Sequence, residues 1–439
     1  MKSELANMLS LSGLIIIFGF MYLIMSRRMA AFTALVIVPV VVALFGGFAP
    51  ELGGMMSKGV STIAPTAAMM MFAIIYFGIM SDAGLFDSLI IKILHAVKGD
   101  PLKVTIGTVI LAMIASLEGE GAVVFMIVCT ALLPLYQKLH MNPVILAVIC
   151  IMDTAVKNLF PWAAPSARVL TVLKLDASEV FHPLIPVIIA GYSWVFLAAY
   201  LLGKKERSRL GIVQIETASI EKISMDITAR HAEHKRPQLF YINLLITLTL
   251  MVVLFANVIP TSVAFIIATA LALAVNYSRM EDQQAHVISH AKEAMTVTVV
   301  IFAAGIFMGI LSETKMTDAI AQTLIAFIPS SIGQYFSIIT AILSAPLTFL
   351  LSNDAFYFGI LPVLNKMASS YGISAAEMGR ASLLGTPIHM LSPLVAALWL
   401  LVGICKISFA DLQRGGIGWC LGLMMLNIVV ALLTGALTF

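Results

Sequence analysis

Long apolar runs without charged residues recur along the whole chain. A transmembrane helix needs about 20 mainly apolar residues to cross ~30 Å of hydrocarbon. Continuous runs of this kind occupy residues 9–25, 31–47, 63–80, 184–202, 239–257, 261–277, 294–311 and 417–438. The pattern predicts an all-α polytopic membrane protein.

Two further apolar spans, 142–172 and 376–402, carry prolines and polar residues in their middle, at 158–166 and 385–393. Proline removes a helix hydrogen bond and clashes with the preceding turn. Each span is therefore predicted to be a broken helix that unwinds at mid-membrane.

Two stretches, 103–138 and 334–364, are apolar but too short to cross the membrane twice. We interpret them as re-entrant hairpins with polar tips at 116–121 and 352–354. Irregular backbone at that depth is tolerated only where protein or water covers it, so both tips should line a cavity.

The basic residues predict the orientation. The loop 204–238 holds eight of the 26 Lys and Arg residues, which favours a cytoplasmic position. Counting the spans outward from this loop gives ten membrane crossings and places both termini outside. The predicted location is the cell (inner) membrane.

A repeated motif suggests internal symmetry. Gly78–Asp82 resembles Gly309–Glu313, and each is followed by a hairpin and a broken helix. The predicted domains are a first repeat over 1–203, the loop 204–238 and a second repeat over 239–439. Five transmembrane helices in each repeat would make the two repeats inverted, an arrangement typical of secondary transporters that bind substrate between paired broken helices.

Composition narrows the class of protein. The chain of 439 residues is 60% hydrophobic and only 11% charged, with a net charge of +3. Soluble domains carry about 25% charged residues, so a soluble enzyme or a nucleic-acid binder is excluded. Lipid is the expected partner at this point, and no nucleic acid is expected.

Glu118 and Glu120 stand at the first hairpin tip. Two close carboxylates repel each other, so one of them is a candidate proton carrier. Together with Asp354 they are also candidate ligands for a hard cation such as Mg²⁺ or Ca²⁺. The alternative is that the tip reaches the surface and both acids are solvated.

The remaining candidates lie at the second tip and in the broken helices. Ser352, Asn353 and Asp354 can bind a carboxylate or a cation, or merely cap the hairpin. The candidate substrate contacts in the breaks are Lys157, Asn158, Pro161, Trp162, Ser166, Thr386, Pro387, His389 and Ser392. Lys157 follows Asp153 by one helical turn, so the two side chains can neutralise each other instead.

At these residues the chain resembles the citrate–divalent metal/proton symporter family (CitMHS) of the ion transporter superfamily. The resemblance runs along nearly the whole chain. The matching stretches include 64–67, 98–103, 158–162, 203–207, 352–359 and 389–394. It implies import of citrate complexed to a divalent cation with proton symport, by a homodimer that works as an elevator. Asn158, Pro161, Trp162, Ser352, Asn353, Asp354, His389 and Ser392 carry over as site candidates by position.

The chain departs from the family pattern around its charged residues. The first tip reads Glu-Gly-Glu-Gly where Asp-Gly-Asp-Gly is usual, and Asp153 and Lys157 replace uncharged residues. Lys157, a fixed charge beside the break, can supply part of the positive charge that a bound divalent cation supplies in the family pattern.

The predicted function is proton-coupled secondary transport of citrate or a related di- or tricarboxylate. The protein needs no cofactor of its own, although Mg²⁺ or Ca²⁺ can travel with the substrate. A sodium-coupled or metal-free carboxylate transporter is the alternative within transport. A channel would need a continuous polar path, whereas the polar groups of this sequence collect at one depth. An intramembrane enzyme is the alternative outside transport, and it would need a nucleophile–base pair or metal ligands.

Overall fold

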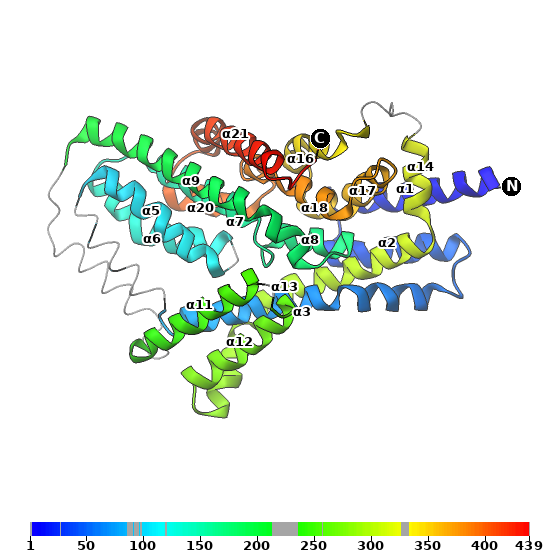
Figure 1. The fold of residues 1–439 in the computed structure, drawn as a ribbon, viewed down its shortest axis with the longest axis horizontal. Helices are drawn as coiled ribbons and strands as arrows, with labels where there is room; N and C mark the ends of the chain where they lie inside the picture. The colour runs from blue at the N-terminus through cyan, green and yellow to red at the C-terminus, as the bar shows by residue number, and fades with distance from the viewer. Residues whose placement is uncertain are drawn as a thin grey trace.

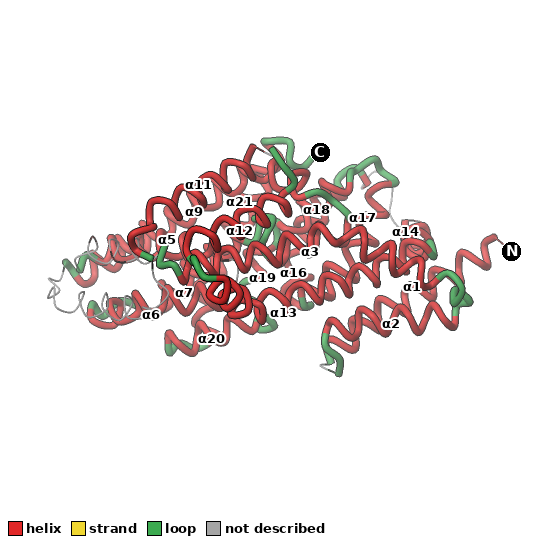
Figure 2. The backbone as a smooth tube through the Cα atoms, turned by 90° about the horizontal axis from the view of Figure 1, so that it is seen from below, coloured by secondary structure: helices red, strands yellow, loops and turns green. Residues whose placement is uncertain are grey.

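A computed structural model describes residues 2–26, 28–85, 91, 96, 99–118, 121–212, 236–256, 258–325 and 333–438. Every regular element in these ranges is helical, and no strand occurs there (Figure 2). The prediction of an all-α fold is confirmed.

The described helices differ widely in length. The helices are α1 (Lys2–Met25), α2 (Ala31–Phe45), α3 (Leu52–Asp82), α5 (Pro101–Ala115), α6 (Gly121–Lys138), α7 (Pro143–Lys157), α8 (Ala164–Leu173), α9 (Ala177–Leu210), α11 (Phe240–Ala256), α12 (Thr261–Asn276), α13 (Met280–Glu313), α14 (Met316–Ile325), α16 (Phe336–Leu350), α17 (Leu361–Ser369), α18 (Ala375–Leu383), α19 (Thr386–His389), α20 (Ala396–Cys405) and α21 (Phe409–Leu433).

Six helical segments in the described part are long and apolar enough to cross a membrane. They are Asn7–Ile24, Leu52–Asp82, Ala177–Leu210, Pro237–Leu254, Met280–Glu313 and Phe409–Leu433. Large apolar side chains on these helices, such as Phe18, Ile189 and Leu245, stay exposed on the protein surface. Lipid is the solvent that makes this exposure favourable, and the protein is a multi-pass membrane protein.

The helices α3 and α13 lie side by side along much of their length (Figure 1). Their contact depends on glycine: a Cβ on Gly59 would lie 2.1 Å from the carbonyl oxygen of Gly305. A Cβ on Gly309 would lie 2.4 Å from the carbonyl oxygen of Met55. Small residues four apart allow such close backbone approach between membrane helices. We call this pair, with the flanking α2 and α12, the α3/α13 body.

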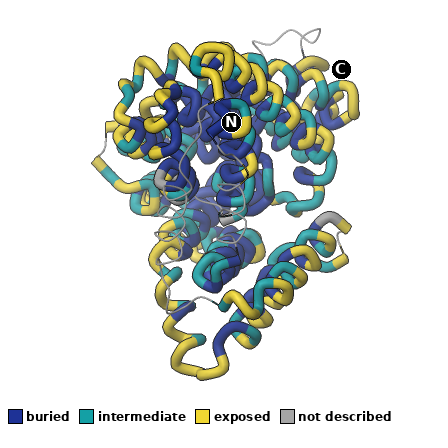
Figure 3. The backbone as a smooth tube through the Cα atoms, turned by 90° about the vertical axis from the view of Figure 1, so that its left-hand side faces the viewer, coloured by how far each residue is buried: buried dark blue, intermediate teal, exposed yellow. Residues whose placement is uncertain are grey.

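The second group of helices surrounds α7, whose residues from Ile145 to Lys157 are all buried. The helices α5, α9 and α21 pack around α7, and α18 packs against α8 and α16. Figure 3 shows buried stretches inside the molecule and exposed stretches at its periphery. We call this group the α7/α8 body.

The stretches interpreted as hairpins fold as pairs of neighbouring helices. In the first, α5 and α6 pack together and meet near Ser116–Glu118, which form a short 3-10 turn. In the second, α16 ends at Leu350 and the chain returns through a π-helical segment, Ala355–Ile360, into α17. Ser116 at the first tip is buried, and Ser352, Asn353 and Asp354 at the second tip are partly buried.

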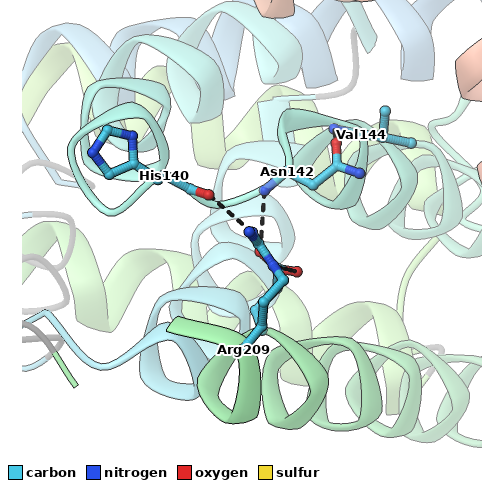
Figure 4. A network of polar contacts seen from close by, with 5 residues as sticks. His140, Asn142, Val144 and Arg209 are labelled. Atoms are coloured by element: carbon cyan, nitrogen blue, oxygen red, sulfur yellow. Dashed lines mark hydrogen bonds and ion pairs between the residues drawn. The ribbon is translucent and has the colours of Figure 1, made fainter. Parts of the chain in front are cut away.

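A polar network anchors the turn between α6 and α7 (Figure 4). Arg209, near the end of α9, donates to the carbonyl oxygen of His140 at 2.9 Å. The Glu206 carboxylate accepts a hydrogen bond from the backbone N–H of Asn142 at 3.2 Å, and the Asn142 side chain caps α7 by accepting from Val144 at 3.0 Å. The start of α7 is thus tied to the end of α9.

The predicted inverted arrangement places Ser208, at the end of α9, and Ser370, after α17, on opposite sides of the membrane. Both positions are exposed, and the four native cysteines are buried. Single cysteines at these sites should therefore label selectively with an impermeant reagent, Ser208→Cys only from the inside and Ser370→Cys only from the outside. Labelling of both from one side would contradict the topology.

Candidate functional site

The first break separates α7 from α8 and comprises residues 158–163. Asn158 lies where α7 ends, and Pro165 occupies the first turn of α8, where its missing N–H costs nothing. The hydroxyl of Ser166 donates to the backbone oxygen of Asn158 at 2.8 Å. This bond satisfies a carbonyl that the end of the helix leaves without a helical partner.

The second break is longer and contains the one-turn helix α19. Its Gly385 touches α16 so closely that a Cβ would lie 2.3 Å from the Ser344 hydroxyl. The hydroxyl of Thr386 donates to the backbone oxygen of Leu383 at 2.7 Å and lies 3.3 Å from that of Ala155 in α7. The amide of Asn158 lies 3.8 Å from the sulfur of Met390. The two breaks are therefore in direct contact.

A cavity of about 730 Å³ lies between the two bodies. Its volume is in the range of small-molecule sites. The wall from the α3/α13 body consists of Met70, Ile74, Gly78, Ser81, Asp82, Ala285, His286, Ser289, His290, Glu293 and Val297. The opposite wall consists of Gly121, Phe125, Thr154, Lys157, Asn158, Trp162, Ala164, Pro165, Asn353, His389, Met390, Val395 and Ala397.

Five of the candidate residues line this cavity: Lys157, Asn158, Trp162, Asn353 and His389. They come from α7, the first break, the second hairpin tip and α19, so the fold brings together segments far apart in the sequence. The structure thus collects amide, ammonium, imidazole and indole groups on one wall.

Six other candidates are not part of the cavity lining: Pro161, Ser166, Ser352, Thr386, Pro387 and Ser392. Ser352 caps the π-helical segment by accepting from the backbone N–H of Ala355 at 3.2 Å. Ser392 donates to the backbone oxygen of Phe349 at 2.6 Å. In this conformation the hydroxyls of these serines and of Thr386 bond to the backbone and support the breaks.

The first hairpin tip borders the cavity through Gly121. The backbone of Glu118 belongs to the 3-10 turn, while its side chain and all of Glu120 lie outside the described residues. Their predicted role in proton or cation coupling stays a prediction.

Asp354 forms an ion pair with Arg168 and is not part of the cavity lining. The Nε of Arg168 donates to Oδ1 of Asp354 at 2.7 Å, and the two side chains are 20% and 18% exposed. Arg168 also donates to the backbone oxygen of Ala164 at 3.0 Å. The pair fastens the second tip to α8.

Lys157 faces the cavity above a buried carboxylate. Asp153, one turn earlier in α7, is completely buried and accepts a hydrogen bond from the hydroxyl of Ser116. Its other oxygen, Oδ1, has no hydrogen-bond partner among the described residues. The buried carboxylate links the first hairpin tip to the helix that carries Lys157.

His389 and Trp162 are held by their surroundings. The Nδ1 of His389 lies 2.7 Å from the backbone oxygen of Thr348, which orients the ring. Trp162 packs against Phe77 of α3 and Phe265 of α12, with ring centroids 6.0 and 5.6 Å away. Trp162 therefore belongs to both the cavity wall and the contact between the bodies.

The sequence interpretation missed the polar groups on the α3/α13 wall. Asp82 accepts hydrogen bonds from His286 at 3.1 Å and from His290 at 2.9 Å. Asp82 attracts notice in the sequence only as part of a repeated motif. The spacing of the two histidines, one turn apart at the polar start of an apolar helix, is the signal that would have found them.

No group of three or more His, Cys, Asp or Glu side chains in the described ranges is arranged to hold a metal ion. Of the predicted cation ligands, Asp354 is engaged by Arg168.

Breaking the Arg168–Asp354 pair should destabilise the fold. Removing one partner of a fully buried pair costs on the order of 3 kcal/mol, and this pair, which is only partly buried, should cost less than that. Arg168→Met and Asp354→Asn should each lower the melting temperature, and the double variant should lose less than the two single losses combined. The more exposed pair Lys366–Asp318 supplies the control, because Lys366→Met should change little. An Asp354→Asn protein with unchanged melting temperature would show that the ion pair with Arg168 does not stabilise the fold.

The chain is similar to known transporters along nearly its whole length. Residues 20–385 match the family described as citrate transporter. A citrate transporter of Bacillus subtilis (strain 168) is 52% identical over 98% of this chain and 100% of its own length. The Mg(2+)/citrate complex secondary transporter of the same organism is 42% identical over 98% and 99%.

Among solved structures, the Neisseria gonorrhoeae MtrF structure covers 89% of this chain and 85% of its own, with a TM-score of 0.57 and 13% identity. That likeness concerns the fold. The family match covers most of the chain, and the two Bacillus subtilis relatives align with nearly all of it. This chain therefore belongs to the citrate transporter family.

Proposed function

We propose that the protein carries citrate or a related di- or tricarboxylate across the cell membrane, coupled to protons. The observation that carries this proposal is the cavity between the two bodies, where Lys157 and Asn158 stand at the edge of a broken helix. The relatives named for citrate and Mg²⁺/citrate transport support the same substrate class.

The first break offers a suitable place for a carboxylate. Ala164 and Pro165, in the first turn of α8, border the cavity, and the first turn of a helix carries partial positive charge. Lys157 adds a full charge at the end of α7. An anion placed between them would meet positive charge from both sides of the break.

The negative charge of a carboxylate substrate must be balanced in the cavity, either by a cation bound with the substrate or by a charged side chain. Opposite unit charges about 4 Å apart interact by ~4 kcal/mol at an effective dielectric constant of about 20. One lysine neutralises only part of a tricarboxylate, so Mg²⁺ or Ca²⁺ accompanying the substrate would supply the remainder. A smaller or partly protonated carboxylate would need no metal.

An elevator motion suits the division into two bodies. The cavity lies at their boundary, and both breaks belong to the α7/α8 body. We propose that this body slides with the substrate along the α3/α13 body, which stays fixed in a homodimer. Alternating access at a midplane site is the mode of transporters built on broken helices.

The substrate is tested by uptake into proteoliposomes. Labelled citrate and smaller carboxylates are supplied with Mg²⁺, Ca²⁺, Na⁺ or a pH gradient, each alone and combined. Proton-driven accumulation of a di- or tricarboxylate is expected. Uptake driven only by Na⁺ would favour the alternative carrier, and absence of any carboxylate uptake would contradict the proposal.

Lys157 should decide how strongly transport depends on metal. Because Lys157→Met removes the fixed positive charge from the cavity, uptake of metal-free carboxylate should be lost, while metal-dependent uptake persists or increases. Unchanged substrate and metal preference in the same uptake assay would leave Lys157 as a structural partner of Asp153.

Glu118 and Glu120 are the predicted proton carriers at the first tip. Glutamine fixes the neutral form at nearly the same size, so uphill pH-driven uptake should fail in Glu118→Gln or Glu120→Gln. Citrate exchange, which needs no net proton movement, is measured in parallel. Full proton-driven accumulation in both single variants and in the double variant would remove these residues from the coupling.

A further inference from the structure

The α3/α13 wall of the cavity carries a titratable cluster that the substrate contacts do not use. We infer that Asp82, His286 and His290 form a proton-binding site on this wall, through which the proton moved with the substrate passes to or from the side where α3 ends. This inference rests on the proposed carboxylate transport and assigns part of its coupling to named residues.

The geometry suits a site with two charge states. A single oxygen of Asp82, Oδ2, accepts from Nδ1 of His286 at 3.1 Å and from Nε2 of His290 at 2.9 Å. Each neutral imidazole has one N–H, and these bonds use it in both rings. A further proton on either ring would make that ring cationic while its hydrogen bond to Asp82 is kept.

The cluster is partly sheltered but still reached by solvent. The side chains of Asp82, His286 and His290 are 16%, 7% and 15% exposed, and all three residues border the cavity. Gly78 makes room for His290, because a Cβ at this position would lie 2.5 Å from Nδ1 of the ring. Both rings therefore adjoin the cavity that is proposed to hold the substrate.

The surroundings include charges of both signs. The ring of Tyr277 stacks on His286 with centroids 3.8 Å apart, and the Arg236 guanidinium lies 5.5 Å from the Tyr277 centroid. Among the residues that the structure describes, the titratable and charged groups around the cluster are Glu293 and Asp282 on α13, Tyr277 after α12, Arg236 before α11, and Lys157 and His389 across the cavity. Protonation of both rings would change the cluster from net negative to net positive and would strengthen attraction for a carboxylate.

The position of the cluster gives the direction. Asp82 is the last residue of α3, and the backbone N–H of Arg236 donates to the carbonyl oxygen of the next residue, Ala83, at 3.0 Å. Arg236 belongs to the predicted cytoplasmic loop 204–238. The cluster thus lies in the cavity wall next to the predicted cytoplasmic end of α3, where a proton can leave to water.

The test measures proton and citrate movement in the same vesicles. Proteoliposomes with an entrapped pH dye receive labelled citrate with Mg²⁺, and the ratio of protons to citrate is recorded at several internal pH values. The ratio should fall and its pH dependence should flatten in H286Q/H290Q and in D82N.

H182Q is the matched control, because His182 in α9 bonds to the backbone oxygen of Leu254 at 3.3 Å and does not line the cavity. An unchanged ratio and pH profile in the double variant would overturn the inference, as would citrate movement without protons in the unmodified protein.

A second measurement does not depend on transport. The ¹⁵N NMR signals of the two rings, identified by their loss in H286Q and H290Q, are followed from about pH 5 to pH 8, the range in which histidine changes charge. Both rings are expected to titrate as a coupled pair, and D82N should shift the pH at which they titrate. Rings that do not titrate, or that D82N leaves unaffected, would overturn the inference. If the unmodified protein moves no carboxylate while the rings titrate together, the proposed function fails and the proton site stands.

Discussion

The need to satisfy backbone groups inside the membrane governs this structure. Each helix end in hydrocarbon leaves N–H and C=O groups whose isolation would cost several kcal/mol apiece. The two breaks supply hydrogen bonds to exposed backbone groups. The hydroxyl of Ser166 donates to the carbonyl oxygen of Asn158 in the first break, and that of Thr386 in the second break lies near the backbone of α7. Because the breaks support each other, they can leave a cavity beside them without losing the fold.

The cavity therefore has two chemically different walls. The wall from the breaks offers amide and ammonium groups and a helix start, which suit a carboxylate. The wall from α3 and α13 offers a carboxylate and two imidazoles, which suit protons. Glycine contacts such as Gly59 with Gly305 hold α3 and α13 at close backbone distance, so this second wall is built on a tightly packed helix pair.

Local sequence signals predicted the helices and the two breaks, because proline acts on its own turn whatever surrounds it. Side-chain partners could not be predicted in the same way. Asp354 looked like a cation ligand at a polar tip, but its partner Arg168 is 186 residues away, and only the folded chain brings them together. The histidine pair was overlooked for the same reason, since its carboxylate lies 204 and 208 residues away on α3.

Both proposals require that substrate binds between the two walls, against the first break. This requirement can be checked in a cryo-electron microscopy structure of the protein in lipid nanodiscs with Mg²⁺ and citrate. New density is expected beside Lys157 and Asn158, within reach of Asn353 and His389, and it should be absent without citrate. Citrate density outside this cavity, with the cavity itself unchanged, would show that the substrate does not bind between the walls.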